Sequence, residues 1–395
     1  MKPNILIFLD RYLPGYKAGG PVQTIANMVS AIGDRYRFHI VTTDRDLGDS
    51  EAYPAVRHGE WMKVGQALVR YLAPKEKNWH TYGQLLKETD FDLVYCQSFF
   101  NPKFTIIPLL SLALSRKRHM PVLLAPRGEF ASGALAHKRF KKKIFISLYK
   151  HFLSKLLNYS FHASSQQEVE AIHQIAGNYV KCFIALNFNA QDHIGLGDIV
   201  LSDHEPLRLA FLGRIDVQKN VDYALNLLCR VKTPVQFDLF GPVSDEDYAQ
   251  HCRALAEQMP EHICVAFKGT LPHPDVLDAL KTYDLFLFPT KNENFGHVIH
   301  EALRAGLPIL ISDRTPWHEM EARNAGWECP LDDPAKFAEH IEAYAAMSPE
   351  QQLNMHKAAL QYGIDVSCDQ RTRDDNIHMI DALLNTTHKT DKKER

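Results

Sequence analysis

Short apolar runs alternate along the chain with longer amphipathic segments, and each run ends near a glycine, proline, aspartate or asparagine. Apolar runs of about four to eight residues between turn residues are typical of buried strands, and helical periodicity between them indicates crossover helices. The pattern therefore predicts α/β domains built on parallel sheets. The expected strands are residues 4–9, 37–42, 92–96, 120–125, 159–163, 180–186, 207–212, 235–240, 263–268, 283–289 and 307–311.

The predicted strands form two similar sets, separated near 195–206 by a polar stretch that holds both glycine and proline. Such a stretch is typical of a domain linker. We therefore expect two doubly wound, Rossmann-like domains at 1–195 and 206–365, and a C-terminal helix and polar tail at 366–395 that pack back toward the first domain. Doubly wound sheets bind ligands at the carboxyl ends of their strands, so the site should lie there, in an inter-domain cleft.

The chain has 395 residues, enough for two or three domains, and it has no uncharged apolar stretch of the roughly 18 to 20 residues that a membrane span needs. Asp10 and Arg11 interrupt the first apolar run after five residues, which is too short for a secretory signal. Seven scattered cysteines without a C-x-x-C pair indicate neither a disulfide framework nor a zinc site. These features predict a cytoplasmic protein.

The net charge of −2 hides an asymmetry between the two halves. Residues 1–190 carry 25 lysines and arginines against 14 acidic residues, whereas the remaining residues carry 20 against 33. Such a division predicts that the two domains have different partners and that the amino-terminal one favours anions. The alternative is that the two domains simply differ in composition.

A glycine-rich turn, Gly15 to Pro21, follows the first predicted strand and precedes an amphipathic helix over about 22–32. Gly19 and Gly20 let backbone N–H groups approach a phosphate, and the helix N-terminus adds a positive partial charge. A tight turn without a ligand is the alternative. The G-x-G-x-x-G spacing of dinucleotide-binding proteins is absent.

A second candidate follows the first strand of the second half. Gly213 and Arg214 come directly after that strand, and Lys219 lies five residues beyond Arg214. Two cations in this place can hold a diphosphate leaving group, as transfer from an activated phosphate donor requires. A solvated pair of charges is the alternative.

The most informative segment runs over 285–308. A buried strand ends at Pro289, a loop carries Glu293, and a helix with apolar residues at helical spacing begins near Phe295. Glu301 should then lie some 9 Å along the helix axis, at roughly 1.5 Å per residue. Two carboxylates at this separation can bind hydroxyl groups on different parts of one extended ligand, although capping and surface roles are the alternatives.

These motifs together resemble the retaining glycosyltransferases of family 4, which have the two-domain GT-B fold, and in particular the group 1 glycosyltransferases of bacterial surface polysaccharide synthesis. The resemblance runs over nearly the whole chain. It rests on the E-x7-E spacing of Glu293 and Glu301 with Phe295 and Gly296 inside it, and on Gly213-Arg214, Lys219-Asn220, Phe240-Gly241-Pro242, Gly269 and Gly19-Gly20.

The resemblance implies roles for these residues. Arg214 and Lys219 would bind the donor diphosphate, Glu293 the hydroxyls of the transferred sugar and Glu301 the nucleotide ribose. Gly19, Gly20, Gly213 and the amides of Asn294, Phe295 and Gly296 would complete the donor site. The donor would be a UDP- or GDP-linked sugar, with no separate cofactor.

One departure concerns the histidine that many members carry after the fourth amino-terminal strand. This chain has Ala125-Pro126-Arg127-Gly128-Glu129 there, so Arg127 and Glu129 are candidates to contact donor or acceptor. Asp44-Arg45-Asp46 matches a D-x-D metal motif, but short polar turns are common after strands. Because GT-B enzymes neutralise the diphosphate with cationic side chains and helix ends, we expect no metal.

Residues 138–157 combine seven cations with an apolar stripe. A basic amphipathic helix of this kind can lie on an anionic membrane surface, and a stripe buried against the sheet is the alternative. Nucleic acid is not expected as a partner, because the motifs of known RNA readers are missing.

We therefore expect a retaining, metal-independent hexosyltransferase that acts at the inner face of the plasma membrane. It would move a sugar from a nucleotide diphosphate to a glycan acceptor, such as a lipid-linked saccharide in exopolysaccharide, capsule or O-antigen synthesis. A GT-B nucleotide-sugar epimerase and a catalytically silent nucleotide-sugar-binding protein are the alternatives.

Overall fold

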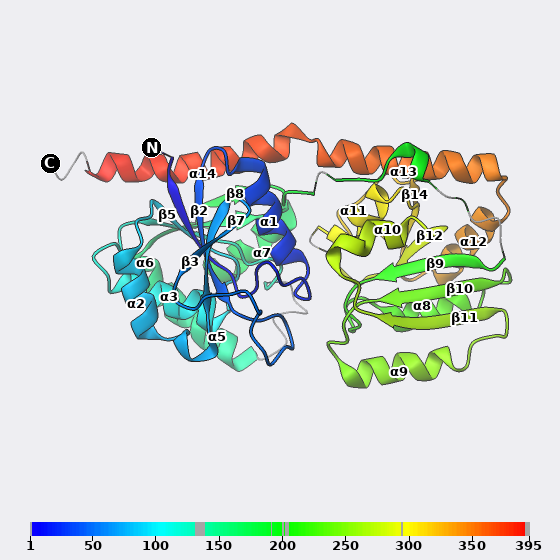
Figure 1. Ribbon diagram of the computed structural model, residues 1–395, viewed down its shortest axis with the longest axis horizontal. Coiled ribbons are helices and arrows are strands. Elements are labelled where there is room, and N and C mark those ends of the chain that lie inside the picture. The colour runs from blue at the N-terminus through cyan, green and yellow to red at the C-terminus, as the bar shows by residue number, and fades with distance from the viewer. Residues whose placement is uncertain are drawn as a thin grey trace. The chain divides into compact units, whose positions relative to one another are not determined.

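The computed structural model describes residues 2–130, 139–190, 192–199, 201, 205–293 and 295–391. The chain forms two compact α/β units, as expected from the alternating pattern (Figure 1). The first unit comprises Met1–Phe188 together with Asp369–Arg395, and the second comprises Asn189–Cys368. Residues 195–206, where we expected the linker, fall within the second unit. No helix in the described ranges is long and apolar enough to cross a membrane.

The first unit is built on an eight-stranded sheet with the order β3-β4-β2-β1-β5-β6-β7-β8. Every neighbouring pair is parallel except β3 and β4, which form an antiparallel pair at one edge. The strands are β1 (Asn4–Phe8), β2 (Arg37–Thr43), β3 (Trp61–Val64), β4 (Ala67–Leu72), β5 (Leu93–Cys96), β6 (Pro121–Leu124), β7 (Asn158–Ala163) and β8 (Cys182–Ile184).

The central strand β1 is buried on both faces because its side chains alternate between two apolar layers. Leu6 and Phe8 join the layer formed with α2, α3, α5 and α7, whereas Ile5 and Ile7 join the layer formed with α1 and α14. The helices are α1 (Gly20–Ile32), α2 (Trp79–Glu88), α3 (Ile107–Ala113), α5 (Arg139–Leu148), α6 (Ser154–Leu156), α7 (Gln166–Ala176) and α14 (Gln370–Asp391), with short turns η1 (Pro74–Glu76), η2 (Pro102–Ile106) and η3 (Tyr149–Leu153).

The second unit has a six-stranded parallel sheet with the order β11-β10-β9-β12-β13-β14. The chain starts at β9, winds outward to β11 and then returns to the other side of β9, so the direction of winding reverses between β9 and β12. Ligands bind beyond the carboxyl ends of the strands at such a reversal. The strands are β9 (Leu207–Leu212), β10 (Val235–Phe240), β11 (Ile263–Gly269), β12 (Leu285–Phe288), β13 (Ile309–Ser312) and β14 (Gly326–Cys329).

One continuous apolar core holds the second unit together, with contributions from all its longer helices. Strand β12 has the sequence Leu-Phe-Leu-Phe and is completely buried, which fits a central strand covered on both faces. The helical segments are η4 (Leu196–Asp198), α8 (Val221–Leu228), α9 (Glu246–Ala256), η5 (His273–Asp275), α10 (Val276–Leu280), α11 (His297–Arg304), α12 (Pro334–Ala345) and α13 (Pro349–Ser367).

Three strands were not predicted, namely β3, β4 and β14. Strand β3 forms the edge of the sheet, and β4 lies between β3 and β2. Lys63 and Arg70 interrupt the apolar residues of these two strands, so their apolar signal is weak. Strand β14 has only four residues and includes Glu328, so its apolar signal is weak.

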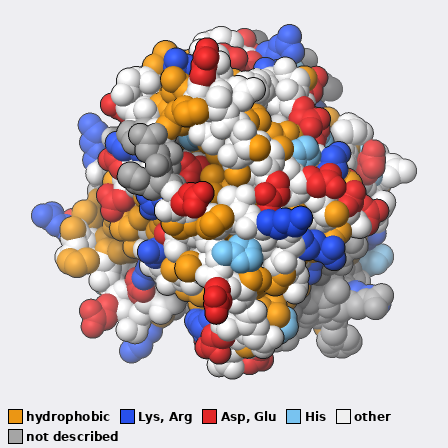
Figure 2. Space-filling view, turned by 90° about the vertical axis from the view of Figure 1, so that its right-hand side faces the viewer, with side chains coloured by type: hydrophobic (Ala, Val, Ile, Leu, Met, Phe, Trp, Pro, Cys, Tyr) orange, Lys and Arg blue, Asp and Glu red, His pale blue; other side chains and the backbone are white. Residues whose placement is uncertain are grey.

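The charge asymmetry of the sequence predicts that the first unit has a surface that favours anions. On the face drawn in Figure 2, lysine and arginine side chains are interspersed with aspartate and glutamate. This face lies on the side of the second unit, which carries the acidic half of the chain, and charges of both signs are mixed on it.

Gly241 shows how closely two backbone segments approach at the end of the second sheet. It follows β10 with φ 143°, and a Cβ atom placed there would lie 1.9 Å from the carbonyl oxygen of Gly213, which follows β9. A side chain of any size would push these two strand ends apart.

We expect Gly241→Ala to lower the free energy of unfolding by about 2 to 3 kcal/mol, because both backbone strain and the clash with Gly213 must be relieved. The matched control is Gly83→Ala, since Gly83 is an exposed helical residue with no neighbour in reach. That change should stabilise by about 0.5 to 1 kcal/mol. Scanning calorimetry checks both variants, and equal melting temperatures would contradict the role of Gly241.

Candidate active site

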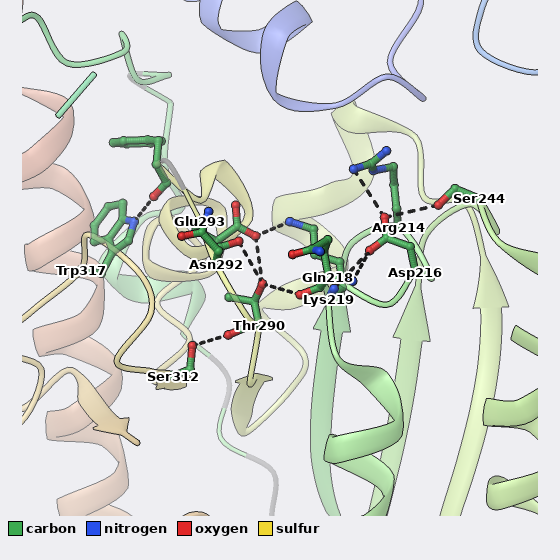
Figure 3. A network of polar contacts seen from close by, with 11 residues as sticks. Arg214, Asp216, Gln218, Lys219, Ser244, Thr290, Asn292, Glu293, Ser312 and Trp317 are labelled. Carbon is green, nitrogen blue, oxygen red and sulfur yellow. Dashed lines mark hydrogen bonds and ion pairs between the residues drawn. The ribbon is translucent and has the colours of Figure 1, made fainter. Parts of the chain in front are cut away.

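Two loops meet beyond the carboxyl ends of β9 and β12, which are neighbouring parallel strands at the reversal point. The loop after β9 carries Gly213, Arg214 and Lys219, and the loop after β12 carries Glu293. Sequence positions some 75 residues apart are therefore brought together by one strand pairing. Figure 3 shows the side chains of Lys219 and Glu293 meeting between the two loops, with Arg214 paired to Asp216.

The loop after β9 is shaped by Asp216, a residue that the sequence analysis did not single out. One of its carboxylate oxygens accepts hydrogen bonds from the backbone N–H groups of Gln218 and Lys219, at 3.0 and 3.1 Å. The other lies 3.4 Å from a guanidinium nitrogen of Arg214. Asp216 thereby forms the turn that presents both cations. A short polar side chain that bonds to the backbone two residues further on is a recognised turn signal of aspartate.

The two loops are tied together by hydrogen bonds. The N–H of Lys291 donates to the carbonyl oxygen of Gln218 at 2.9 Å, and the Asn220 side-chain amide donates to the carbonyl oxygen of Pro289 at 2.9 Å. The Thr290 hydroxyl lies 3.1 Å from the same Gln218 oxygen and 3.4 Å from the Glu293 carboxylate. These contacts fix the relative position of the loops.

The central contact of the site is an ion pair between the Lys219 ammonium and the Glu293 carboxylate. Both side chains are largely buried, with 17% and 12% of their surface exposed. The ammonium also lies 5.4 Å from the centre of the Phe288 ring. Opposite charges held in a partly dry site interact more strongly than they would in water.

Arg214 differs from Lys219 in its exposure. Its side chain is 48% exposed, and it pairs with Asp216 within the same loop. A guanidinium presents paired N–H donors that match two oxygens of a phosphate. The site therefore combines one exposed, fork-shaped cation with one enclosed ammonium.

The second loop leads into α11, whose first residue is His297 rather than Phe295 as the sequence predicted. Gly296 precedes the helix in a left-handed conformation, which delays the helical start. The Trp317 indole donates a hydrogen bond to the carbonyl oxygen of Phe295, and the two rings pack edge to face 5.4 Å apart. Trp317 thus holds the loop that bears Phe295 and Gly296. Asn294 lies outside the described residues.

Glu301 lies within α11, and because the helix begins at His297 it sits about 6 Å along the axis, nearer its start than predicted. Its side chain is 11% exposed, and its carboxylate lies 3.5 Å from the imidazole of His273. His273 was not predicted and comes from the short turn η5 after β11. The two carboxylates of the E-x7-E spacing therefore have separate partners, Lys219 and His273.

In the first unit, the glycine-rich turn is held by Asp46. This carboxylate accepts hydrogen bonds from the N–H groups of Tyr16 and Lys17 at 2.9 and 3.1 Å. Gly19, with φ 70° and ψ −132°, adopts a conformation open to glycine, and Gly20 begins α1. The amides of Tyr16 and Lys17 are thus already occupied, which leaves the start of α1 as the part of the turn that could face a ligand.

Arg127 follows β6 with a positive φ of 52° and is held on three sides by neutral groups. Its guanidinium donates to the Gln97 side chain at 3.0 Å, to the Tyr95 hydroxyl at 2.9 Å and to the Asn187 side chain. In the described part of the chain no carboxylate lies within ion-pair distance of it. A fixed cation without a counter-ion is suited to an anionic ligand.

Behind Arg127, the Tyr95 hydroxyl contacts Nδ1 of His162, whose Nε2 lies 2.8 Å from the carbonyl oxygen of Ala185. Burial, with the nearby Arg127 charge, lowers the pKa of His162 to about 3. The imidazole is therefore neutral at physiological pH, and its Nε2 donates while Nδ1 accepts. This arrangement orients the tyrosine that supports Arg127.

Glu129, two residues beyond Arg127, is occupied within the first unit. Its carboxylate accepts from the Ser98 hydroxyl and the N–H of Phe99, both at 2.6 Å, and from the N–H of Phe100 at 3.1 Å. Burial raises the pKa of Glu129 despite these hydrogen bonds. In this structure the side chain orders the loop after β5, next to the candidate residue Arg127.

Asp44, the first residue of the D-x-D motif, is fully buried and bonds to Arg45 at 2.9 Å and to His58 at 3.0 Å. Burial alone would raise the pKa of Asp44, but these hydrogen bonds outweigh it and hold the pKa below its ordinary value. Asp46 serves the glycine-rich turn. Within the described ranges, no group of three or more histidine, cysteine or acidic residues is placed to hold a metal ion.

Both units have the doubly wound architecture of GT-B glycosyltransferases. The solved structure of HepE from Anabaena in complex with UDP-glucose is similar, with a TM-score of 0.66 and 14% identity over 96% of this chain and 99% of that chain. Residues 198–362, which include the Arg214, Lys219, Glu293 and Glu301 site, match the family Glycosyl transferases group 1. The second unit is therefore similar to group 1 glycosyltransferases, and the chain has the GT-B fold.

Two curated proteins are also similar to parts of the chain. Sulfoquinovosyl transferase SQD2 of Arabidopsis thaliana is 31% identical over 116 residues, which are 29% of this chain and 21% of that protein. An uncharacterized 41.2 kDa protein in the cps region of Klebsiella pneumoniae is 23% identical over 243 residues, which are 58% of this chain and 62% of that protein. The matches thus span about a fifth and about three fifths of these relatives' lengths.

His300 on α11 links the site to the acid stability of the second unit. It is buried, and its Nε2 lies 3.1 Å from the carbonyl oxygen of Gly363 in α13. Burial, with the nearby Arg304 charge, lowers the pKa of His300 to about 3. An unfolded histidine has a pKa near 6.5, so below that pH protons bind preferentially to the unfolded chain.

We therefore expect the contribution of His300 to stability to be complete above about pH 6.5 and to fall by about 2 kcal/mol by pH 5. Melting temperatures of the wild type and His300→Gln between pH 8 and pH 5 test this. His318, whose side chain is 60% exposed, provides the control variant His318→Gln. The His300 variant should lose stability less steeply on acidification, and parallel curves for all three proteins would contradict the assignment.

Proposed function

We propose that this protein is a retaining glycosyltransferase that moves a sugar from a UDP- or GDP-linked donor to a glycan acceptor. The observation that carries the proposal is the Lys219–Glu293 ion pair beside Arg214, at the reversal point of a sheet that matches the group 1 family. Within one unit, the cations Arg214 and Lys219 would bind the diphosphate of the donor, and the carboxylate of Glu293 would bind its sugar.

Each charged group has a role that follows from its position. The diphosphate would lie between Arg214 and Lys219, where the ammonium can stabilise the negative charge that grows as the sugar–phosphate bond breaks. Glu293 would turn to the sugar hydroxyls and stabilise the oxocarbenium-like sugar. Donor binding would therefore replace the internal ion pair with two contacts to one ligand. Because these cations neutralise the diphosphate, we propose that the reaction needs no metal or other cofactor.

Retention of configuration would follow from attack on the same face as the departing phosphate. Glu293 would stabilise positive charge on the sugar in this reaction and would not form a covalent bond to it. The leaving phosphate would then accept the proton of the acceptor hydroxyl. Positioning of the two substrates would supply most of the rate acceleration.

The remaining site residues would bind the parts of the ligands farther from the reacting bond. Glu301 would bind the ribose, and Gly19, Gly20, Gly213 and the Phe295–Gly296 backbone would approach the donor. Arg127 would meet an anionic part of the donor or acceptor, with Glu129 ordering the adjacent loop. We propose that the acceptor is a lipid-linked saccharide in surface polysaccharide synthesis, and the similarity to a protein of a Klebsiella cps region is consistent with that setting.

The experiment measures binding first and turnover second. In a thermal-shift screen of nucleoside diphosphates, the correct one at 100 times its Kd should stabilise the protein by about 2.7 kcal/mol. With that donor series and an acceptor, Lys219→Ala and Glu293→Gln should lower kcat by about 10²- to 10³-fold. Glu301→Gln should act chiefly on the donor KM.

The matched control is Lys291→Ala, which removes an exposed cation from the same loop as Glu293 and should change kcat less than twofold. Excess EDTA should leave the wild-type rate unchanged. Near-normal turnover in both Lys219→Ala and Glu293→Gln would reject this site as the reaction centre. Conversion of donor without any acceptor would indicate an epimerase instead.

We also propose that the enzyme works in the cytoplasm and binds the inner face of the plasma membrane. The helix α5 and the turn η3 have two apolar stripes. Phe145, Tyr149 and Leu153 are buried in the first unit, whereas Ile144, Leu148 and Phe152 are 56%, 37% and 47% exposed. Exposed Lys143 and Lys155 flank the second stripe. One stripe of this segment therefore packs in the core of the first unit, and the other remains available to contact a membrane.

If this stripe binds lipid, replacing Ile144, Leu148 and Phe152 together by serine should lower the affinity for anionic liposomes tenfold or more, as measured by sedimentation. The reason is that three apolar side chains are no longer buried in the membrane. Leu114→Ser is the control, because Leu114 is 72% exposed elsewhere in the first unit. Binding of the wild type should rise with anionic lipid and fall with salt. Equal binding to neutral and anionic vesicles would contradict the proposal.

A further inference from the structure

Lys77 is a half-buried cation without a counter-ion, located where the strands of the first sheet end. It follows β4 and the turn η1, directly before α2. Its ammonium donates one hydrogen bond to the hydroxyl of Thr43, the last residue of β2, and lies 5.5 Å from the centre of the Phe104 ring. An ammonium has three N–H donors, so this contact leaves donor capacity unused.

The two carboxylates whose charges act on the Lys77 ammonium are each paired with another cation. Asp10 pairs with Arg11 at 2.6 Å, and Asp44 pairs with Arg45 at 2.9 Å. Throughout the described ranges, no carboxylate lies within 4.0 Å of the Lys77 ammonium. Each of those aspartates is matched by an arginine, so neither is free to pair with the Lys77 ammonium.

A neighbouring donor is also unsatisfied. The Nε–H of Arg11 is buried and has no acceptor in the structure. Burial lowers the pKa of Lys77, and the charges of Arg11 and Arg45 act in the same direction against Asp10 and Asp44. Burying a cation and a donor without partners lowers stability, and such an arrangement is retained where a ligand supplies the missing charge.

We propose that Lys77, with Arg11 beside it, binds a phosphate group of the acceptor. Strands β1, β2 and β4 are adjacent in the sheet, so Arg11, Thr43 and Lys77 follow neighbouring strand ends. A lysine point charge beside an arginine fork suits a phosphate oxygen cluster. The inference rests on the proposed function, because it specifies the acceptor as a phosphate-bearing saccharide, and it assigns a site separate from Arg214 and Lys219.

Methyl NMR of the full chain with labelled threonine tests the site, with inorganic pyrophosphate as the probe. Thr43 reports on Lys77, and Thr290 reports on the Lys219–Glu293 site, so one titration follows both. We expect both signals to shift in the wild type. In Lys77→Met, the apparent affinity reported by Thr43 should fall about 10- to 100-fold while the Thr290 response is unchanged.

The control Lys87→Met, an exposed lysine on α2, should leave both responses intact. The signal of Thr105, buried in the first unit, verifies that each variant is folded. A Thr43 response that is absent, identical in Lys77→Met, or obtained with glucuronate but not with pyrophosphate would overturn the phosphate site. Absence of the Thr290 response alone would count against the proposed donor site and leave the Lys77 assignment standing.

Discussion

The pairing of β9 with β12 is the constraint on which the site depends. These strands are separated by more than seventy residues in the sequence, yet their carboxyl ends are adjacent in the sheet. The pairing places the ammonium of Lys219 against the carboxylate of Glu293, and hydrogen bonds through Gln218 and Thr290 fix the distance between the loops. Without this strand pairing, Lys219 and Glu293 would be separate charges on the surface.

Much of the fold could be predicted from the sequence because central parallel strands are buried on both faces. The runs that became β1, β9 and β12 are almost wholly apolar, so their signal survives without any knowledge of their neighbours. The edge strand β3, its neighbour β4 and the short strand β14 lack that signal. Their identity as strands depends on a partner, which periodicity alone does not reveal.

The site was predictable to a similar degree. Arg214, Lys219 and Glu293 follow strong strands and are charged, so position and chemistry pointed to them together. The sequence analysis did not identify the residues that hold the backbone of the loops in place. Asp46 bonds to amides thirty residues away, and Trp317 bonds to a carbonyl twenty-two residues away. Such contacts have no local pattern, since the choice of partner is made by the tertiary fold.

The first unit is built from two segments that are far apart in the sequence, and this affects how it folds during translation. Met379, Ile380, Leu383 and Leu384 of α14 complete an apolar layer against β1 and α1. During translation at about 5 to 20 residues per second, the 180 residues that separate Phe188 from Asp369 delay that completion by roughly 10 to 40 seconds. For that interval the nascent first unit presents an open apolar face. The second unit is encoded within the gap, so all of its core residues are synthesised before α14.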